Sequence, residues 1–497
     1  MTTELRLLLN PADAERLMKL PLLADASADH EYRVSCYYDT ADGYLRQNGY
    51  QLSTHWTRGR WAQLLQNSRE AEEESVTHDI DSDEINYAHL PVNGKSGRRF
   101  ANLVAKQDLE RLSRVELQRT LWTVQLTSET QVAITLDHGE INALNQRMPI
   151  CELKLALITG TLQDVYAWVL KHTEDYSLSW ALGELTPGDY PLLAAEPVTH
   201  HKARPLALAK ACNSEEAFVA IIQACLAHAQ LNLDAVKAGQ DEGVHQMRVA
   251  FRRLRSCLKT FRPLIPKETS LSLVKELQWL NEALGPARDW DVFLHDTLLP
   301  ILERFPNKRS LSLLTRRVET IRSKCYRTLK QSLADPRYQR LILRLHGWLD
   351  CREWREDLSP ELAQPAVEFA TAQLKRNHRR VVNRGRRFAE LSIEERHQLR
   401  IRIKELRYTT EFFASLFSGS STLDYAKSAA KLQDCLGALN DLSVAEHLLN
   451  SLNIRSASTA RSLIEGWYAC QAASQEQDFA ASWEAFLACD RPWKKRS

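Results

Sequence analysis

A short run of the sequence places five basic side chains three or four residues apart. They are His245, Arg248, Arg252, Arg255 and Lys259. Because an α-helix turns about 100° per residue, these side chains fall within an arc of about 80° on one helix face. Arginine offers paired N–H donors to phosphate oxygens, and lysine offers a point charge. The spacing therefore predicts a helical face that binds a polymer of negative charge.

A second run repeats this spacing 152 residues later, with His397, Arg400, Lys404 and Arg407. Like charges at positions i and i+4 destabilise a helix by about 0.2–0.5 kcal/mol per pair. Two aligned rows, called here the first and second stripes, therefore favour a bound polyanion that offsets the repulsion. The simpler alternative is a solvated basic face, and either histidine could instead hold a hydrogen bond inside a helical bundle.

Two further landmarks keep the same register of 152 residues. Phe261 corresponds to Phe413, and Leu284–Asp289 corresponds to Leu436–Asp441. Three landmarks in one register over about 45 residues indicate an internal repeat. We therefore predict that the stripes lie on two copies of one helical bundle, each of about 130–150 residues.

The elements that must position the stripes differ from those at the start of the chain. Up to about residue 185, alternating segments such as Leu121–Leu126 and Val132–Leu136 predict β-strands, and Asp137–Glu140 predicts a turn between two of them. Residues 186–205 contain four prolines and predict a linker. Residues 206–497 have the apolar spacing of helices.

The charge of the chain is divided unevenly between these parts. Residues 1–200 carry about 18 Lys and Arg against 29 Asp and Glu, whereas the remainder carries about 47 against 34. Such a division predicts an anionic partner for the basic part. The ten cysteines are scattered singly, without zinc-site spacing. No segment has the ~20 apolar residues of a membrane span, and no signal peptide is recognisable, so we expect a cytoplasmic protein with no membrane partner.

The helical half resembles the CHAD domain family in the blocks VHQMRVAFRRLRSCLKTF, ALGPARDWDVFL, LRIRIKELRYTTEFF and LQDCLGALNDLSVAEHLL. The resemblance covers about residues 210–490. It implies two four-helix bundles related by a pseudo-twofold axis, with a basic channel between them that binds inorganic polyphosphate. The residues it assigns to that site are His245, Arg248, Arg252, Arg255, His397, Arg400, Lys404 and Arg407, with Arg253, Lys259, Arg288 and Tyr408 as neighbours. Arg288 could equally be an ion-pair partner of Asp289.

The first 185 residues resemble the CYTH domain, or triphosphate tunnel family, in TELRL, CYYDTADGYLRQNGYQL, GRWAQLLQ, LDHGEINA and PICELKL. The resemblance implies a β-barrel in which carboxylates hold Mg²⁺ or Mn²⁺ while lysines and arginines grip a triphosphate. Much of that pattern is missing here. The motif positions hold Arg6 for lysine, Ser53 and His55 for two arginines, Gln66 for lysine, and Lys154 for a carboxylate. What remains is Arg6, Arg114 and Arg119 in the tunnel and Glu4 and Glu152 as metal ligands.

These observations predict an α+β protein. An antiparallel, tunnel-like β-barrel at residues 1–185 is followed by a linker at 186–205 and a helical domain of two pseudo-symmetric four-helix bundles at 206–497. We expect it to bind inorganic polyphosphate without a cofactor and to associate with polyphosphate granules, while its barrel has lost catalysis. One alternative is a triphosphatase that requires Mg²⁺ or Mn²⁺ and uses the helical domain as a tether. Another is a non-specific nucleic-acid binder.

Overall fold

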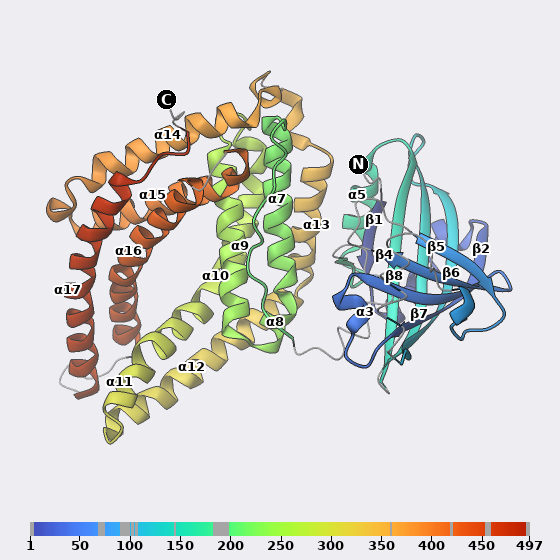
Figure 1. Cartoon of the computed structure of the whole chain (residues 1–497), viewed down its shortest axis with the longest axis horizontal. Coiled ribbons are helices and arrows are strands. Elements are labelled where there is room, and N and C mark those ends of the chain that lie inside the picture. The colour runs from blue at the N-terminus through green and yellow to red at the C-terminus, as the bar shows by residue number, and fades with distance from the viewer. Residues whose placement is uncertain are drawn as a thin grey trace. The chain divides into compact units, whose positions relative to one another are not determined.

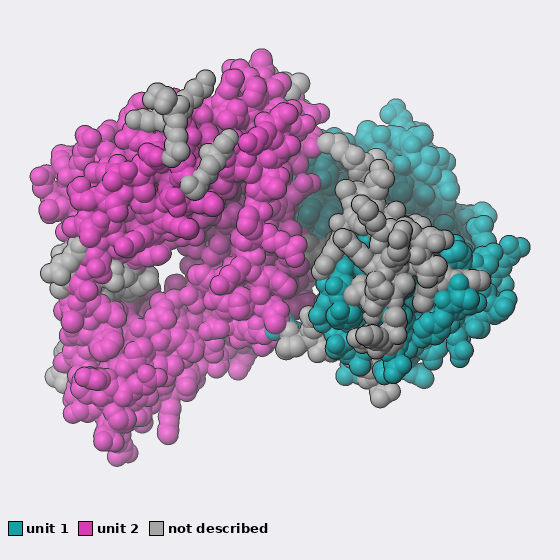
Figure 2. All heavy atoms as spheres, viewed as in Figure 1, with its two compact units in different colours: residues 1–198, 342–351 teal, residues 199–341, 352–497 magenta. Residues whose placement is uncertain are grey.

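The computed structural model describes residues 4–67, 75–89, 100, 104, 108–143, 146–181, 198–357, 360–417, 421–452 and 459–493. The chain divides into two compact units (Figures 1 and 2). Unit 1 contains residues 1–198 and 342–351, and unit 2 contains residues 199–341 and 352–497. Most of the predicted linker, residues 182–197, lies outside the described residues.

Unit 1 is built on one antiparallel sheet of nine strands in the order β5-β4-β3-β2-β6-β7-β8-β1-β9. The strands are β1 (Glu4–Leu8), β2 (Ala28–Asp39), β3 (Tyr50–Thr57), β4 (Arg60–Asn67), β5 (Ser75–Ile80), β6 (Glu110–Gln125), β7 (Gln131–Ala143), β8 (Gln146–Thr159) and β9 (Ser179–Trp180). Its helices include α1 (Pro11–Leu17), α2 (Pro21–Ala24), α3 (Tyr44–Gln47) and α5 (Leu162–His172). The predicted antiparallel sheet is confirmed. Within the described part of the chain, no ladder joins its end strands β5 and β9.

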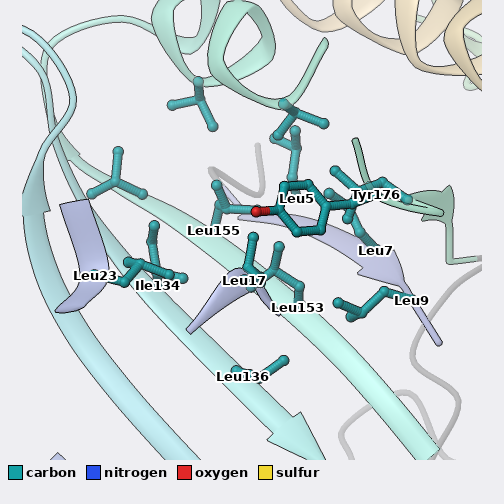
Figure 3. Packing of buried hydrophobic residues seen from close by; sticks show 14 of the residues in the cluster. Leu5, Leu7, Leu9, Leu17, Leu23, Ile134, Leu136, Leu153, Leu155 and Tyr176 are labelled. Carbon is teal, nitrogen blue, oxygen red and sulfur yellow. The ribbon is translucent and has the colours of Figure 1, made fainter. Parts of the chain in front are cut away.

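One face of β1 and β8 is apolar because side chains alternate along each strand. Leu5 and Leu7 of β1 pack with Leu153 and Leu155 of β8 in a buried cluster (Figure 3). Buried residues of α1 and α5 complete the cluster. The opposite face of the same strands consequently carries the polar side chains.

The turn predicted at Asp137–Glu140 is wrong, because β7 runs through it. An aspartate and a glycine are typical of turns, but here each residue has another structural role. Asp137 accepts two hydrogen bonds from Arg119 of the neighbouring strand β6. Gly139 lies so close to β6 that an added Cβ would stand 1.9 Å from the carbonyl oxygen of Glu116. The glycine therefore permits a close approach of two strands.

A short segment from the helical half of the sequence belongs to unit 1. Residues 342–351 form the second part of α13 (Pro336–Asp350) and its end. His346 stacks on Trp180 with 3.7 Å between ring centroids, and the hydroxyl of Tyr166 donates to Asp350 at 2.5 Å. The pattern of the sequence does not indicate this membership.

The regular elements among the described residues of unit 2 are all helices. Its longer helices are α7 (Ser214–Leu231), α9 (Asp241–Thr260), α10 (Leu271–Val292), α12 (Arg309–Ala334), α14 (Ala366–Gly385), α15 (Ile393–Phe412), α16 (Ser421–Ser451) and α17 (Thr459–Ala488). Shorter ones are α8 (Leu233–Ala238), the π-helix η3 (Phe293–Leu298) and α11 (Leu299–Arg304). The first and second repeats are called here α7 to α12 and α14 to α17. Side-chain capping boxes start α7 at Asn213 and α15 at Ser392.

The helix boundaries follow the internal repeat predicted from the sequence. Helices α9 and α15 begin at Asp241 and Ile393 and end at Thr260 and Phe412, so both boundaries differ by 152 residues. Asn213 and Pro365, which cap α7 and α14 at the same offset, form an isolated antiparallel bridge with each other. Equivalent segments that pair antiparallel in this way indicate a pseudo-twofold relation between the repeats.

The segment Ser214–Ala238 has the length and hydropathy of a membrane span. However, 61% of its apolar window is buried inside the protein. Ile221, Ile222 and Leu226 are at most 1% exposed, as in the core helix of a folded bundle.

We predict that Gly139→Ala destabilises the protein by about 1–3 kcal/mol, because the new Cβ meets the backbone of β6 and forces the strands apart. Denaturant unfolding of the full chain measures this. Gly466→Ala is the control, since a Cβ there meets nothing within 4 Å in a helix, where alanine is favoured. Equal stability of the two variants would show that β6 and β7 have room to separate.

Candidate anion-binding site

The first stripe lies on α9, where Arg248 is anchored to the neighbouring helix α10. Its Nη1 donates to the carbonyl oxygen of Gly285 at 2.6 Å and lies 3.3 Å from a carboxylate oxygen of Asp289. Burial lowers the pKa of Arg248 and raises the pKa of Asp289. The sequence offers Arg288 as a possible ion-pair partner of Asp289. In the structure, the arginine that contacts Asp289 is Arg248.

His245 is a partly buried side chain with three arginines around it. Burial lowers its pKa to about 4, and Arg288, Arg252 and Arg248 lower it further, while Glu242 acts in the opposite direction. The imidazole is therefore neutral at pH 7. Beside it, the Nε of Arg252 is buried and makes no hydrogen bond within the described residues. A buried donor of this kind is uncommon and is often satisfied by a ligand or water. Arg255, further along the stripe, is exposed.

The second stripe lies on α15, where His397, Arg400 and Lys404 are each half-buried. Arg407 donates from Nε to Glu411 at 2.7 Å and lies over the ring of Tyr408. Tyr408 itself is only 2% exposed. Tyr408 therefore supports Arg407 from within the bundle and presents little surface to a ligand. The side chains of 438–443, which include the counterpart of Asp289, lie outside those described.

Two ion pairs join α9 to α15. Arg253 bonds to Glu411, and Lys259 bonds to Glu405. Arg253 also lies over the ring of Phe412, with 5.3 Å from its guanidinium carbon to the ring centroid. Two of the cations expected near the anion site are thus engaged between the repeats.

The two ion pairs are equivalent under the repeat but reversed in sign. An offset of 152 residues carries Arg253 onto Glu405 and Lys259 onto Glu411. The first repeat therefore supplies both cations, and the second supplies both carboxylates. Phe261 and Phe413, another equivalent pair, lie 6.0 Å apart and both contact Phe369. Because equivalent residues meet here, the pseudo-twofold axis passes near the C-terminal ends of α9 and α15.

The predicted tunnel residues of unit 1 mostly share the polar face of the sheet. The ladders pair Arg6 with Lys154 and Arg119 with Asp137, and they place Glu4, Glu152 and His55 on the same face by alternation. Arg114 is five residues from Arg119 in one continuous strand, so it points to the opposite face. There it pairs with Asp83 and Glu116.

Each tunnel cation on the polar face is matched by an adjacent carboxylate. Arg119 makes a bidentate pair with Asp137 at 2.6 Å. Lys154 lies 3.4 Å from Asp137 and 3.2 Å from Glu152, and Arg6 lies 2.6 Å from Glu4. The sequence prediction of a turn misses the role of Asp137. The signal for that role is its place two residues after Thr135 in an alternating run.

The carboxylates present do not fit a metal pair that bridges a triphosphate. Glu4 is bonded to Arg6, and Glu152 lies beside Lys154. Such a site needs several free oxygen ligands. Among the residues that the structure describes, no group of three or more His, Cys, Asp or Glu could hold a metal ion. His55 is bonded to Ser35 and Ser53, and burial lowers its pKa to about 4, so it adds no positive charge at pH 7.

The resemblance of the helical half is confirmed by comparison with known proteins. Residues 220–450 match the CHAD domain family. The crystal structure of the CHAD domain from the plant Ricinus communis covers 59% of this chain and 98% of that chain, with 33% identity and a TM-score of 0.52. An uncharacterised protein of Mycobacterium tuberculosis is 29% identical over 226 residues, or 43% of this chain. The match spans only 41% of that relative's length.

Solved structures also resemble unit 1, at a lower level. A Hippeastrum protein reported with a dominant triphosphatase activity covers 40% of this chain, with 13% identity and a TM-score of 0.25. Likeness at this level does not bear on the chemistry of unit 1. The helical half is different, because the Ricinus communis domain is matched over nearly its whole length at 33% identity. The chain therefore belongs to the CHAD family.

Proposed function

We propose that unit 2 binds inorganic polyphosphate along the two cationic stripes of α9 and α15. The observation that carries this proposal is the buried Nε of Arg252, which has no hydrogen-bond partner within the described residues. It lies beside His245, whose pKa is lowered by burial and then by arginines of α9 and α10, against the opposite effect of Glu242. A phosphate oxygen would accept that hydrogen bond and reduce the repulsion among the arginines.

The length of the stripes favours an extended polymer over a single compact anion. The first stripe spans about 15 Å from His245 to Arg255 at 1.5 Å per residue and continues to Lys259, and the second stripe spans about 15 Å from His397 to Arg407. The repeat relates these two rows, so a chain of regularly spaced charges can meet both. Figure 2 shows an opening through unit 2, between the places where Figure 1 draws α10 and α16. We propose that the polymer passes there.

The same stripes lack the features with which proteins grip single-stranded nucleic acid. Binding of that kind combines cations with aromatic rings on which bases stack. Phe251 and Tyr408, which stand among the stripe residues, are each 2% exposed and pack inside the bundle. Polyphosphate needs no stacking surface, so the site fits it better than it fits nucleic acid.

The proposal is tested by titrating the full chain with long-chain polyphosphate at physiological salt. We expect tight binding that an excess of duplex DNA does not displace, and that EDTA leaves unchanged because the proposed site holds no metal. Displacement by DNA would reduce the stripes to a generic basic surface.

Reversing the charge of the stripes tests their role directly. We predict that replacing Arg248, Arg252, Arg400 and Lys404 by Glu abolishes polyphosphate binding, because attraction becomes repulsion along both rows. Circular dichroism checks that the helices remain. The matched control replaces the exposed cations Arg309, Arg316, Arg317 and Lys324 of α12 by Glu, the same change in net charge. An equal loss of polyphosphate affinity in both variants would show that binding depends on net charge alone.

His245 gives a pH dependence whose sign is fixed by its pKa. In the free protein the pKa is lowered to about 4 from its ordinary value of 6.5, so the imidazole binds no proton at pH 7. Bound phosphate raises this pKa, so binding takes up a proton, and affinity increases as the pH falls from neutral toward the free-state pKa of about 4.

The measurement is calorimetric titration in buffers of different ionisation enthalpy, which counts the protons taken up. We predict that His245→Gln reduces this proton uptake while helicity is retained. Identical uptake in the native protein and the variant would show that His245 is not near the bound chain.

For unit 1 we propose a non-catalytic role, supported by the pairing of its cations with carboxylates. Arg119 and Lys154 are already engaged by Asp137 and Glu152, so they offer a triphosphate little net charge. We predict no release of phosphate from tripolyphosphate with Mg²⁺ or Mn²⁺ above that of a heat-denatured control. Metal-dependent release that Glu4→Ala abolishes would contradict the proposal.

A further inference from the structure

A pocket of about 310 Å³ lies in unit 2 where the end of α9 meets α14 and α15. Four cations line it: Lys259 and Arg262 from the end of α9 and the residues after it, and Arg376 and Arg380 from α14. One carboxylate, Glu405 of α15, is present. The volume is at the lower end of the range for ligand pockets.

The charge of this pocket is not balanced from within. Glu405 is bonded to Lys259. The other three cations make no ion pair or hydrogen bond with any described residue. Burial, together with Arg376 and Arg402, lowers the pKa of Arg380, while Glu405 acts in the opposite direction without cancelling these effects. These arginines therefore repel one another in the absence of a ligand.

Two buried amides add neutral donors to the pocket wall. Gln373 and Asn377 of α14 are 9% and 7% exposed. Asn377 donates to Thr409 at 3.1 Å, whereas the amide of Gln373 makes no hydrogen bond within the described part of the chain. An unpaired amide next to three unpaired arginines is the donor set that binds phosphate oxygens.

The repeat shows that the fold does not require these cations. At an offset of 152 residues, Arg376 and Arg380 correspond to Ala224 and His228, and Lys259 and Arg262 correspond to Glu411 and Ala414. None of the four positions holds an arginine or a lysine in the other repeat. The stripes are repeated, whereas the basic lining of this pocket is not, so the pocket is a separate feature from the stripes.

We propose that this pocket is a second anion site, one that takes the terminal phosphate of an oligophosphate. The ligand is either a free short oligophosphate or the end of a polyphosphate chain held on the stripes. The second source rests on the proposed function, and Lys259 belongs to both features. A terminal phosphate carries nearly two negative charges at pH 7, as a phosphate monoester does, so it matches a compact set of cations better than an internal unit does.

The test is a titration of the full chain with tripolyphosphate. We predict that Arg376→Ala with Arg380→Ala lowers tripolyphosphate affinity at least tenfold. The matched control is Lys375→Ala with Arg379→Ala, which removes two exposed cations from the same helix outside the pocket and should stay within about twofold of the native protein. Circular dichroism confirms that both variants keep their helices.

The stripe variant with Glu at 248, 252, 400 and 404 separates this proposal from the proposed function. We expect it to lose long-chain polyphosphate but to keep tripolyphosphate. Unchanged tripolyphosphate binding in the pocket variant overturns the second site, whatever the stripes do. Persistent long-chain binding in the stripe variant overturns the proposed function alone.

A series of chain lengths at constant total phosphate distinguishes the two sources. If the pocket takes chain ends, its variant loses more affinity for short chains, which have more ends, than for long ones. If it takes only free short oligophosphates, the pocket variant binds all longer chains as the native protein does.

Discussion

The arrangement of unit 2 depends on the contact between α9 and α15. Arg253 and Lys259 reach from the first repeat to Glu411 and Glu405 of the second, and Phe261 meets Phe413 beside them. Partly buried ion pairs contribute little net stability because desolvation offsets the attraction, but a misplaced pair leaves unpaired charge and is strongly unfavourable. Their effect is therefore to fix one register between the helices. The stripes and the pocket both rest on these two helices.

The two units contain similar residue types and use them differently. On the polar face of unit 1, Arg119 and Lys154 form ion pairs with carboxylates of neighbouring positions, and these ion pairs neutralise their charge. In unit 2, His245 and Arg380 each have several arginines around them and one carboxylate that acts in the opposite direction. A balanced set of charges stabilises a fold, whereas an unbalanced one stores repulsion that an anionic ligand can relieve. This contrast is why the proposed binding functions are assigned to the helices.

Local spacing allowed the repeat and the stripes to be predicted from the sequence, because helical periodicity and a constant offset need no knowledge of packing. The partners of those residues could not be predicted. The pairing of Arg253 with Glu411 depends on how two helices cross, and the place of 342–351 in unit 1 depends on distant packing. The turn predicted at Asp137 is wrong because its neighbours are typical of turns although they lie within a strand. The prediction places Arg114 and Arg119 in one tunnel, whereas an odd separation in one strand puts them on opposite faces.

The reversed ion pairs also bear on how a duplicated gene can diverge. Suppose that two copies of the first repeat met in the way the two repeats meet here. Each contact would then set Arg253 against Lys259, and two copies of the second repeat would set Glu405 against Glu411. Neither repeat can therefore form a homodimer through this surface without facing like charges. A single-repeat ancestor that dimerised here would have needed other residues at these positions. With the present residues, each repeat finds opposite charges at this surface only on the other repeat of the same chain.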